Sequence, residues 1–148
     1  MDARNYLRQI HRLEALISMR QRQIKDLRKS MAYMKSIDYS ADRVQTSPDG
    51  SGFTSDAIRL ADMELEIERK IHQCEHLRET IIGQIERMPD QRYIDVLSGI
   101  YIHRKDLMDL ADDLHYDYYW VCHLHGEALS AFERQYPEIR NQTQENTN

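Results

Sequence analysis

Two histidines and a glutamate in this sequence stand at the spacing of a zinc peptidase motif. His72, Glu75 and His76 form the pattern H-x-x-E-H, in which two histidines one helical turn apart bind zinc and the glutamate activates water. Cys74, between them, falls on the apolar seam of a predicted helix, and neither a third ligand nor a cleft accompanies the motif. The pattern therefore favours a coiled-coil segment, and we predict that the chain is not an enzyme.

A second pair of possible metal ligands is Cys122 with His125, one helical turn apart. Two ligands do not complete a structural metal site, and the sequence holds no C-x-x-C pair. We therefore expect no metal and no cofactor. The cysteines Cys74 and Cys122 are far apart in the sequence, which favours reduced thiols and a cytoplasmic protein. No apolar run approaches the roughly 20 residues of a membrane span, so no membrane partner is expected.

The elements that must position these residues are mostly long helices. Apolar residues recur at alternating steps of three and four over residues 6–34 and again over 60–88, which predicts two long helices with heptad seams. The segment 37–54 between them is rich in Ser, Asp, Gly and Pro and has no periodicity, which predicts a loop. Residues 1–88 are thus predicted to form a long antiparallel coiled-coil helical hairpin. Its seam residues are Ile10, Leu13, Ile17, Ile24, Leu27, Met31, Met34, Leu60, Met63, Ile67, Cys74, Leu77, Ile81 and Met88, interrupted by Arg20, Lys70 and Gln84.

Three shorter helices are predicted after Pro89, over about residues 90–103, 105–114 and 118–135. Asp117 stands where the last of them needs an N-cap. The residues expected to face inward on that helix are Val121, Leu124, Ala128, Leu129 and Phe132. The polar end of the chain, residues 137–148, is predicted to be disordered. The fold class expected is therefore all-α, a hairpin followed by a three-helix domain over residues 89–136.

A resemblance to a known family lies in the C-terminal segment Asp90–Arg134, which reads DQRYIDVLSGIYIHRKDLMDLADDLHYDYYWVCHLHGEALSAFER. This segment resembles region four of bacterial sigma factors, and is more similar still to the region-four-like proteins of phages and prophages of Gram-positive bacteria. The loop DRVQTSPDG at Asp42–Gly50 and the stretch RNYLRQIHRLEALI at Arg4–Ile17 fit the same family, so the resemblance covers nearly the whole chain. It implies a helix-turn-helix in residues 89–136 and a DNA-binding transcriptional regulator.

The resemblance and the periodicity together nominate a DNA-recognition surface. It consists of Tyr118, Tyr119, Cys122 and His123, on the outer face of the N-terminal half of the last helix, the part that enters the major groove in helix-turn-helix proteins. Family members are expected to carry Arg or Lys at several of these places and glycine where His115 stands. The aromatic residues Trp120, Tyr116, Tyr118 and Tyr119 are predicted to pack within the turn and the core rather than to form a base-stacking platform.

The charge is distributed unevenly, which bears on any nucleic-acid function. Residues 1–36 carry 9 Lys and Arg against 3 Asp and Glu, a net charge of +6, whereas residues 90–148 carry 5 against 11, a net charge of −6. The basic residues Arg4, Arg8 and Arg12 could therefore supply phosphate contacts to an otherwise acidic domain. Alternatively, they pair with glutamates of the second long helix, namely Glu64, Glu68, Glu75, Glu79 and Glu86.

Two partner hypotheses follow from the same observations. If the acidic domain does not bind DNA, the chain is an interaction adaptor that docks on RNA polymerase or another basic partner. A homodimer is also predicted, because apolar residues remain outside the two seams: Leu7, Leu16, Ile71, Ile82 and Ile85. Pairing two hairpins into a four-helix bundle would cover this strip. A C-terminal domain folded over the strip would cover it as well.

Overall fold

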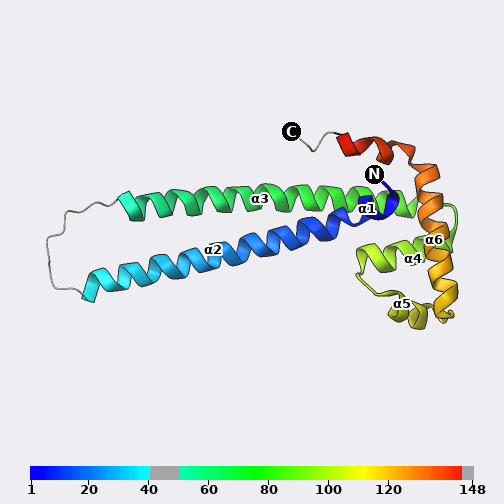
Figure 1. Ribbon diagram of the computed structural model, residues 1–148, viewed down its shortest axis with the longest axis horizontal. Helices are drawn as coiled ribbons and strands as arrows, with labels where there is room; N and C mark the ends of the chain where they lie inside the picture. The colour runs from blue at the N-terminus through cyan, green and yellow to red at the C-terminus, as the bar shows by residue number, and fades with distance from the viewer. Residues whose placement is uncertain (41–50, 145–148) are drawn as a thin grey trace. The chain divides into compact units, whose positions relative to one another are not determined.

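The computed structural model describes residues 1–40 and 51–144, and within these ranges every regular element is helical, which confirms the all-α prediction. The elements in order are α1 (Ala3–Leu7), α2 (Gln9–Ser40), α3 (Ser51–Glu86), α4 (Gln91–Leu97), the π-helical segment η1 (Ser98–Ile102), α5 (Leu107–Leu114), α6 (Tyr118–Gln135) and the 3-10 helix η2 (Pro137–Gln144) (Figure 1). None of the helices in these ranges is long and apolar enough to cross a membrane.

The chain divides into two compact units. The hairpin unit is Leu13–Gln73, and the C-terminal unit combines Met1–Arg12 with Cys74–Asn148. Both ends of the predicted 1–88 hairpin therefore group with the C-terminal helices. The long helices α2 and α3 each contribute residues to both units.

In the hairpin unit, α2 and α3 run antiparallel (Figure 1). The seam prediction is confirmed at Ile24 and Ile67, which are both 7% exposed. Most other seam residues of this unit are half-buried, and Met34 near the end of α2 is 61% exposed. Two helices alone therefore cover this seam only in part, as expected for a single pair without a third layer.

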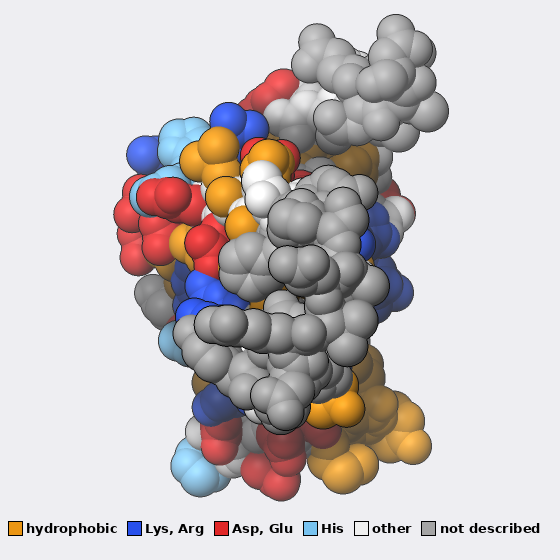
Figure 2. Space-filling view, turned by 90° about the vertical axis from the view of Figure 1, so that its left-hand side faces the viewer, with side chains coloured by type: hydrophobic (Ala, Val, Ile, Leu, Met, Phe, Trp, Pro, Cys, Tyr) orange, Lys and Arg blue, Asp and Glu red, His pale blue; other side chains and the backbone are white. Residues whose placement is uncertain are grey.

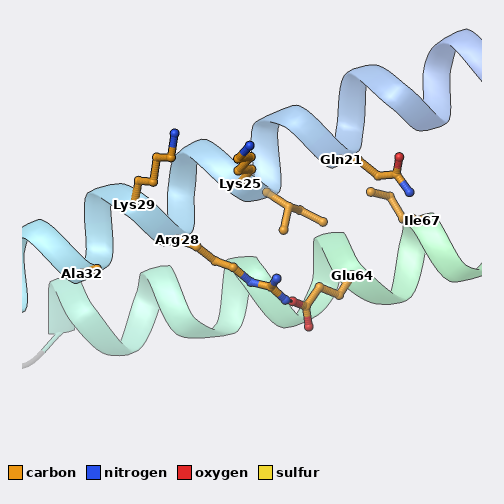
Figure 3. A pocket seen from close by; sticks show the side chains of 8 residues that line it. Gln21, Lys25, Arg28, Lys29, Ala32, Glu64 and Ile67 are labelled. Carbon is orange, nitrogen blue, oxygen red and sulfur yellow. The ribbon is translucent and has the colours of Figure 1, made fainter.

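The charged interruptions of the seam share one carboxylate. Arg20 Nη2 and Lys70 Nζ each lie 4.0 Å from Glu66 Oε1. Beyond Arg20 along α2, the Arg28 side chain extends to α3 and forms an ion pair with Glu64 (Figure 3). The Arg20–Glu66 and Arg28–Glu64 pairs link basic α2 to acidic α3 and so favour the antiparallel register.

A cavity of about 610 Å³ lies beside this last ion pair. Figure 3 shows Lys25 and Lys29 of α2 pointing away from α3, while Arg28 spans the two helices. The lining residues are Gln21, Ile24, Lys25, Arg28, Lys29, Ala32, Glu64 and Ile67. This cavity is the groove between two helices, walled by seam residues and solvated lysines.

Both ends of the loop predicted over residues 37–54 are helical in the structure. Residues 37–40 belong to α2 and residues 51–54 belong to α3. The motif Asp42–Gly50 lies outside the described residues.

The C-terminal unit is built around α6, whose inward stripe is buried as predicted. Its main cluster joins Phe132 of α6 to Leu7 of α1, Ile85 of α3 and Leu97 of α4. A smaller cluster contains Val96, Leu110, Ala111, Val121 and Leu124, which hold α4 and α5 against the N-terminal half of α6. The first turns of the N-terminal segment and the last turns of α3 are thus part of the same core as α6.

This core changes the argument for a homodimer. Leu7 and Ile85 are 0% and 1% exposed, and Ile82 packs against the same cluster. These residues are covered by the chain's own C-terminal helices, which was the alternative to covering them by a second copy. The dimer prediction no longer has support from this strip.

Part of the segment predicted to be disordered, residues 137–144, forms η2. Ile139 is 0% exposed within the main cluster, and Tyr136 packs on Phe132 with ring centroids 4.9 Å apart. Two apolar side chains in a polar sequence are sufficient to hold one short helix, because each buries a large apolar area.

Candidate nucleic-acid interface

The segment between α5 and α6 is a three-residue turn of defined geometry. Leu114 ends α5 and His115 follows in the left-handed conformation, with φ 55° and ψ 41°. The Tyr116 N–H donates to the Ala111 carbonyl at 3.0 Å, which is the hydrogen bond that closes a helix ended by a left-handed residue. Glycine adopts this conformation at the lowest cost, so the position where the resemblance expects glycine is one where glycine would suit the backbone.

Both helices flanking this turn are capped by aspartates. The Asp106 side chain accepts from the Asp109 N–H at 2.8 Å at the start of α5. The Asp117 side chain accepts from the Tyr119 N–H at 3.1 Å at the start of α6, which confirms the predicted N-cap. The beginning of α6 is therefore fixed at the residues nominated for DNA recognition.

The packing behind the turn depends on Gly99 in η1. A methyl group added at Gly99 would lie 2.6 Å from Leu110 Cδ1 of α5, and Leu110 itself is only 3% exposed. The close approach of η1 to α5 therefore requires a residue without a side chain at this position.

The four nominated recognition residues share the outer face of α6. Tyr119 is 79% exposed, Tyr118 and His123 are also exposed, and Cys122 is half-buried. A hydrogen bond with the Cys122 side chain raises the pKa of Tyr118, so its hydroxyl stays protonated and can donate. Glu127 stands one turn beyond His123 and accepts from its Nε2 at 3.0 Å. The surface is thus polar and aromatic rather than basic.

The aromatic residues at the start of α6 do not pack as predicted. Trp120 is 42% exposed and Tyr116 is 38% exposed; the Trp120 ring lies against the ring of His123, with centroids 5.4 Å apart. Apolar side chains lie beside acidic ones at the lower edge of Figure 2, at the level where Figure 1 draws α5. The buried stripe of α6 begins with Val121 and Leu124, and Trp120 lies off this stripe because residues that share a helix face are three or four positions apart.

The basic residues nominated for phosphate contacts have a separate location. Arg4 and Arg8 line a cavity of about 530 Å³ together with Arg104 and Lys105 from the segment before α5. The remaining lining residues are His11, Ile100, Tyr101, Asp106, Leu107 and His125. Among the described residues, neither Arg4 nor Arg8 forms an ion pair, so their predicted pairing with glutamates of the second long helix is not observed.

The helical backbone explains why two of the three N-terminal arginines reach this cavity. The Arg8 N–H donates to the Arg4 carbonyl and the Arg12 N–H donates to the Arg8 carbonyl, at 3.0 and 3.1 Å, so the three side chains follow one another at one-turn intervals. Arg12 lies outside the cavity lining, and its Nη2 donates to Asn5 Oδ1 at 3.2 Å.

Two histidines stand in the wall of the cavity and are held by Tyr101. The His11 Nε2 lies 2.9 Å from the Tyr101 carbonyl oxygen, and the Tyr101 hydroxyl lies 2.9 Å from His125 Nε2. Burial, and then the positive charges of Arg4 and Arg8, lower the pKa of His125 to about 4. Burial is also the main cause that lowers the pKa of His11. Both rings are therefore neutral near pH 7.

Sequence reasoning found Arg4 and Arg8 but missed Arg104, Lys105 and His11. Arg104 and Lys105 could have been found, because they form a basic dipeptide immediately before a predicted helix in an otherwise acidic domain. Nothing in the sequence pattern indicated that Arg4 and Arg104 line the same cavity, because their positions depend on the packing of α1 against α6.

The candidate metal ligands do not converge. Cys122 lines a surface hollow with His123 and Tyr93, whereas His125 lines the basic cavity and interacts with Tyr101. The described part of the chain holds no group of three or more His, Cys, Asp or Glu residues placed to bind a metal ion.

Comparison with known proteins adds no further constraint. No protein family model, no curated protein and no solved structure matches this chain. The functional assignment therefore depends on the turn between α5 and α6, the outer face of α6 and the basic cavity.

Proposed function

We propose that this chain is a phage-type DNA-binding transcriptional regulator in which α4 to α6 form a helix-turn-helix domain and α6 is the recognition helix. The observation that carries the proposal is the turn at His115, where a left-handed residue closes α5 and three residues lead into the capped start of α6. This geometry leaves the N-terminal half of α6 exposed, as insertion into a major groove requires.

The side chains on this face have the chemistry to contact DNA. The Tyr118 and Tyr119 hydroxyls can bond phosphate oxygens, and their rings can pack on thymine methyl groups. His123 and Cys122 lie one turn further along α6 and would face the base edges. Sequence preference would then come from a few hydrogen bonds and apolar contacts rather than from arginine pairs with guanine.

The electrostatic part of binding needs basic residues from outside α6. Non-specific affinity for duplex DNA comes mainly from neutralised phosphates, and α5 presents exposed Asp109, Asp112 and Asp113. Arg4, Arg8 and, outside the cavity, Arg12 would supply the compensating charge. The proposal therefore includes modest affinity with a shallow salt dependence, since few basic residues contribute.

The proposal is tested by fluorescence polarisation with a duplex selected from a random pool by the purified protein. Tyr119→Ala and His123→Ala should each weaken binding to the selected duplex about fivefold or more, the loss expected for a base contact. Tyr33→Ala is the matched control, because Tyr33 is a 68% exposed tyrosine of α2. Equal affinity of the parent and both α6 variants would exclude this face as the DNA-binding surface.

A second function is favoured by the exposed aromatic residues beside acidic ones. Tyr119, Trp120 and the α5 aspartates form a surface suited to a basic protein partner, and aromatic residues are enriched at such interfaces. In this case the chain is an adaptor that docks on RNA polymerase or another basic protein. No duplex binding even at low salt, with capture of purified RNA polymerase that Trp120→Ala abolishes, would favour it over the first function.

Homodimer formation remains part of the proposal, but through a different surface. The hairpin unit exposes Met19, Met34, Ile58 and Leu65, each by 47–61% of its surface. A second hairpin could cover these residues and the half-buried seam. A dimer would also present two copies of α6, as a two-fold DNA site needs.

A further inference from the structure

We propose that the cavity formed by Arg4, Arg8, Arg104 and Lys105 is a binding site for a phosphate group. The cavity is separate from the outer face of α6, since the two surfaces have no lining residue in common. Its chemical feature is a lining that includes three arginines and one lysine from two distant segments of the chain.

The cavity has an excess of positive charge that the protein does not itself neutralise. Asp106 is the only carboxylate among its lining residues, and this side chain already caps α5 by accepting from the Asp109 N–H. Lys105 is paired with Asp113, whereas Arg4 and Arg8 have no ion-pair partner among the described residues. The unbalanced charge is therefore that of Arg4 and Arg8.

The neighbouring histidines show the effect of this charge. Burial is the main cause that lowers the pKa of both histidines, and the arginines add to it, Arg4 and Arg8 at His125, and Arg104 and Arg8 at His11. Nearby cations disfavour the protonated ring in the same direction as burial does. An anion in the cavity would reverse this contribution, so the histidines serve as internal reporters of binding.

The residue types favour phosphate over a carboxylate or chloride. Guanidinium groups present paired N–H donors that match two oxygens of one phosphate, and arginines on two walls can contact different oxygens of the same group. The volume of about 530 Å³ is within the usual range for small-molecule sites. The walls therefore suit a phosphate that carries an attached sugar or nucleotide.

Two sources could supply such a phosphate. One is the backbone of duplex DNA bound by α6, since phosphate contacts flanking the recognition helix fix its orientation; this source rests on the proposed function. The other is a free phosphorylated ligand that binds whether or not the protein recognises DNA. The phosphate chemistry is the same, and the experiment must separate the sources.

The test uses the full chain and the ring nitrogen signals of His11 and His125 in NMR spectra at pH 7. Pyrophosphate is the probe, titrated against sodium chloride of equal ionic strength, and a short random duplex is the second ligand. We expect pyrophosphate to shift both histidine signals and the combined Arg4→Ala and Arg8→Ala variant to weaken its binding roughly tenfold or more. Arg104→Ala removes a further cation of the cavity lining and should weaken binding as well.

Arg12→Ala is the matched control, because Arg12 is an exposed arginine of the same segment that lies outside the cavity. It should leave pyrophosphate binding within about twofold of the parent, since it removes charge but no contact. Thermal unfolding of each variant checks that the fold is retained, which is expected because Arg4 and Arg8 are exposed.

The outcomes separate this inference from the proposed function. If pyrophosphate and the duplex both lose affinity in the Arg4→Ala and Arg8→Ala variant, the site takes a backbone phosphate. If pyrophosphate binds through these arginines and the duplex does not bind at all, the site takes a free phosphorylated ligand and the proposed function fails. If pyrophosphate causes no more change than chloride, or binds the parent and variant equally, the inference is wrong even where the duplex binds.

Discussion

The pKa of His125 makes the stability of this protein dependent on pH in a defined window. In the folded chain the pKa is about 4, whereas an unfolded chain has a histidine pKa of about 6.5. The neutral ring is favoured by the fold, so this contribution to stability is fully present above pH 6.5 and is lost as the pH falls toward 4. The unfolded chain takes up the proton over this range and the folded chain does not.

The size of the effect follows from the shift and from the partial exposure of the ring. A shift from 6.5 to about 4 corresponds to about 3 kcal/mol for a fully enclosed group, at roughly 1.4 kcal/mol for each pKa unit. The His125 ring is only partly enclosed, so water screens part of this cost and we expect about 1–2 kcal/mol.

Urea unfolding at pH 7 and pH 4.5 measures this contribution. In the His125→Gln variant the glutamine can still accept from Tyr101 but cannot titrate. From pH 7 to pH 4.5, the free energy of unfolding of this variant should therefore decrease by about 1–2 kcal/mol less than that of the parent. His103→Gln, which removes an exposed histidine, should behave as the parent does. A parent and a His125→Gln variant that lose the same stability over this interval would refute the argument, as would an NMR titration of His125 centred near 6.5.

Two further predictions concern the packing around Gly99 in the C-terminal unit and the exposed apolar residues of the hairpin unit. Gly99→Ala should lower the free energy of unfolding by about 1–3 kcal/mol, because the new methyl group overlaps Leu110. The control Gly83→Ala, whose added methyl group would lie 3.9 Å from the nearest atom of Arg87, should raise the free energy of unfolding by up to about 1 kcal/mol. Equal effects of the two variants in urea unfolding would mean that η1 can move away from α5 without cost. Sedimentation equilibrium of the parent protein should show a dimer. The combined Met34→Glu and Leu65→Glu variant should dissociate this dimer, since both side chains are exposed in the hairpin unit. A parent species of 17.7 kDa at micromolar concentration would exclude the dimer.

The sequence was sufficient to predict which faces of the helices are apolar, but not what covers them. The heptad spacing identified Ile24, Ile67 and Ile81 as seam residues, and all three are buried. The same spacing placed Leu7 and Ile85 outside the seam, and they are among the most buried residues because α6 packs on them. Periodicity reports the apolar face of one helix, whereas the choice between a second copy and the chain's own C-terminal helices depends on long-range packing.

The candidate site shows the same division between local and long-range signals. The cap at Asp117 and the exposed position of Tyr119 follow from residue types within one or two helical turns, and both were predicted. The exposure of Trp120 was not predicted, because aromatic residues are usually well buried. That Arg4 and Arg104 line the same cavity could not be inferred from their spacing in the sequence.

The position of Arg4 in the cavity depends on how the start of the chain is tied to the end of α6. The Ala3 N–H donates to Glu133 Oε1 at 2.9 Å, and Arg140 Nη2 donates to Glu133 Oε2 at 3.1 Å. The backbone N–H of Ala3, and then Arg140, lower the pKa of the Glu133 carboxyl, so it remains ionised and holds both partners at neutral pH. Tyr6 reinforces the attachment, since its hydroxyl donates to Gln84 Oε1 at 2.8 Å and its ring packs 6.1 Å from that of Phe132. Arg4 and Arg8 are thus attached to the same core that positions α6, so the basic cavity and the outer face of α6 belong to one compact C-terminal unit rather than to two independent parts of the sequence.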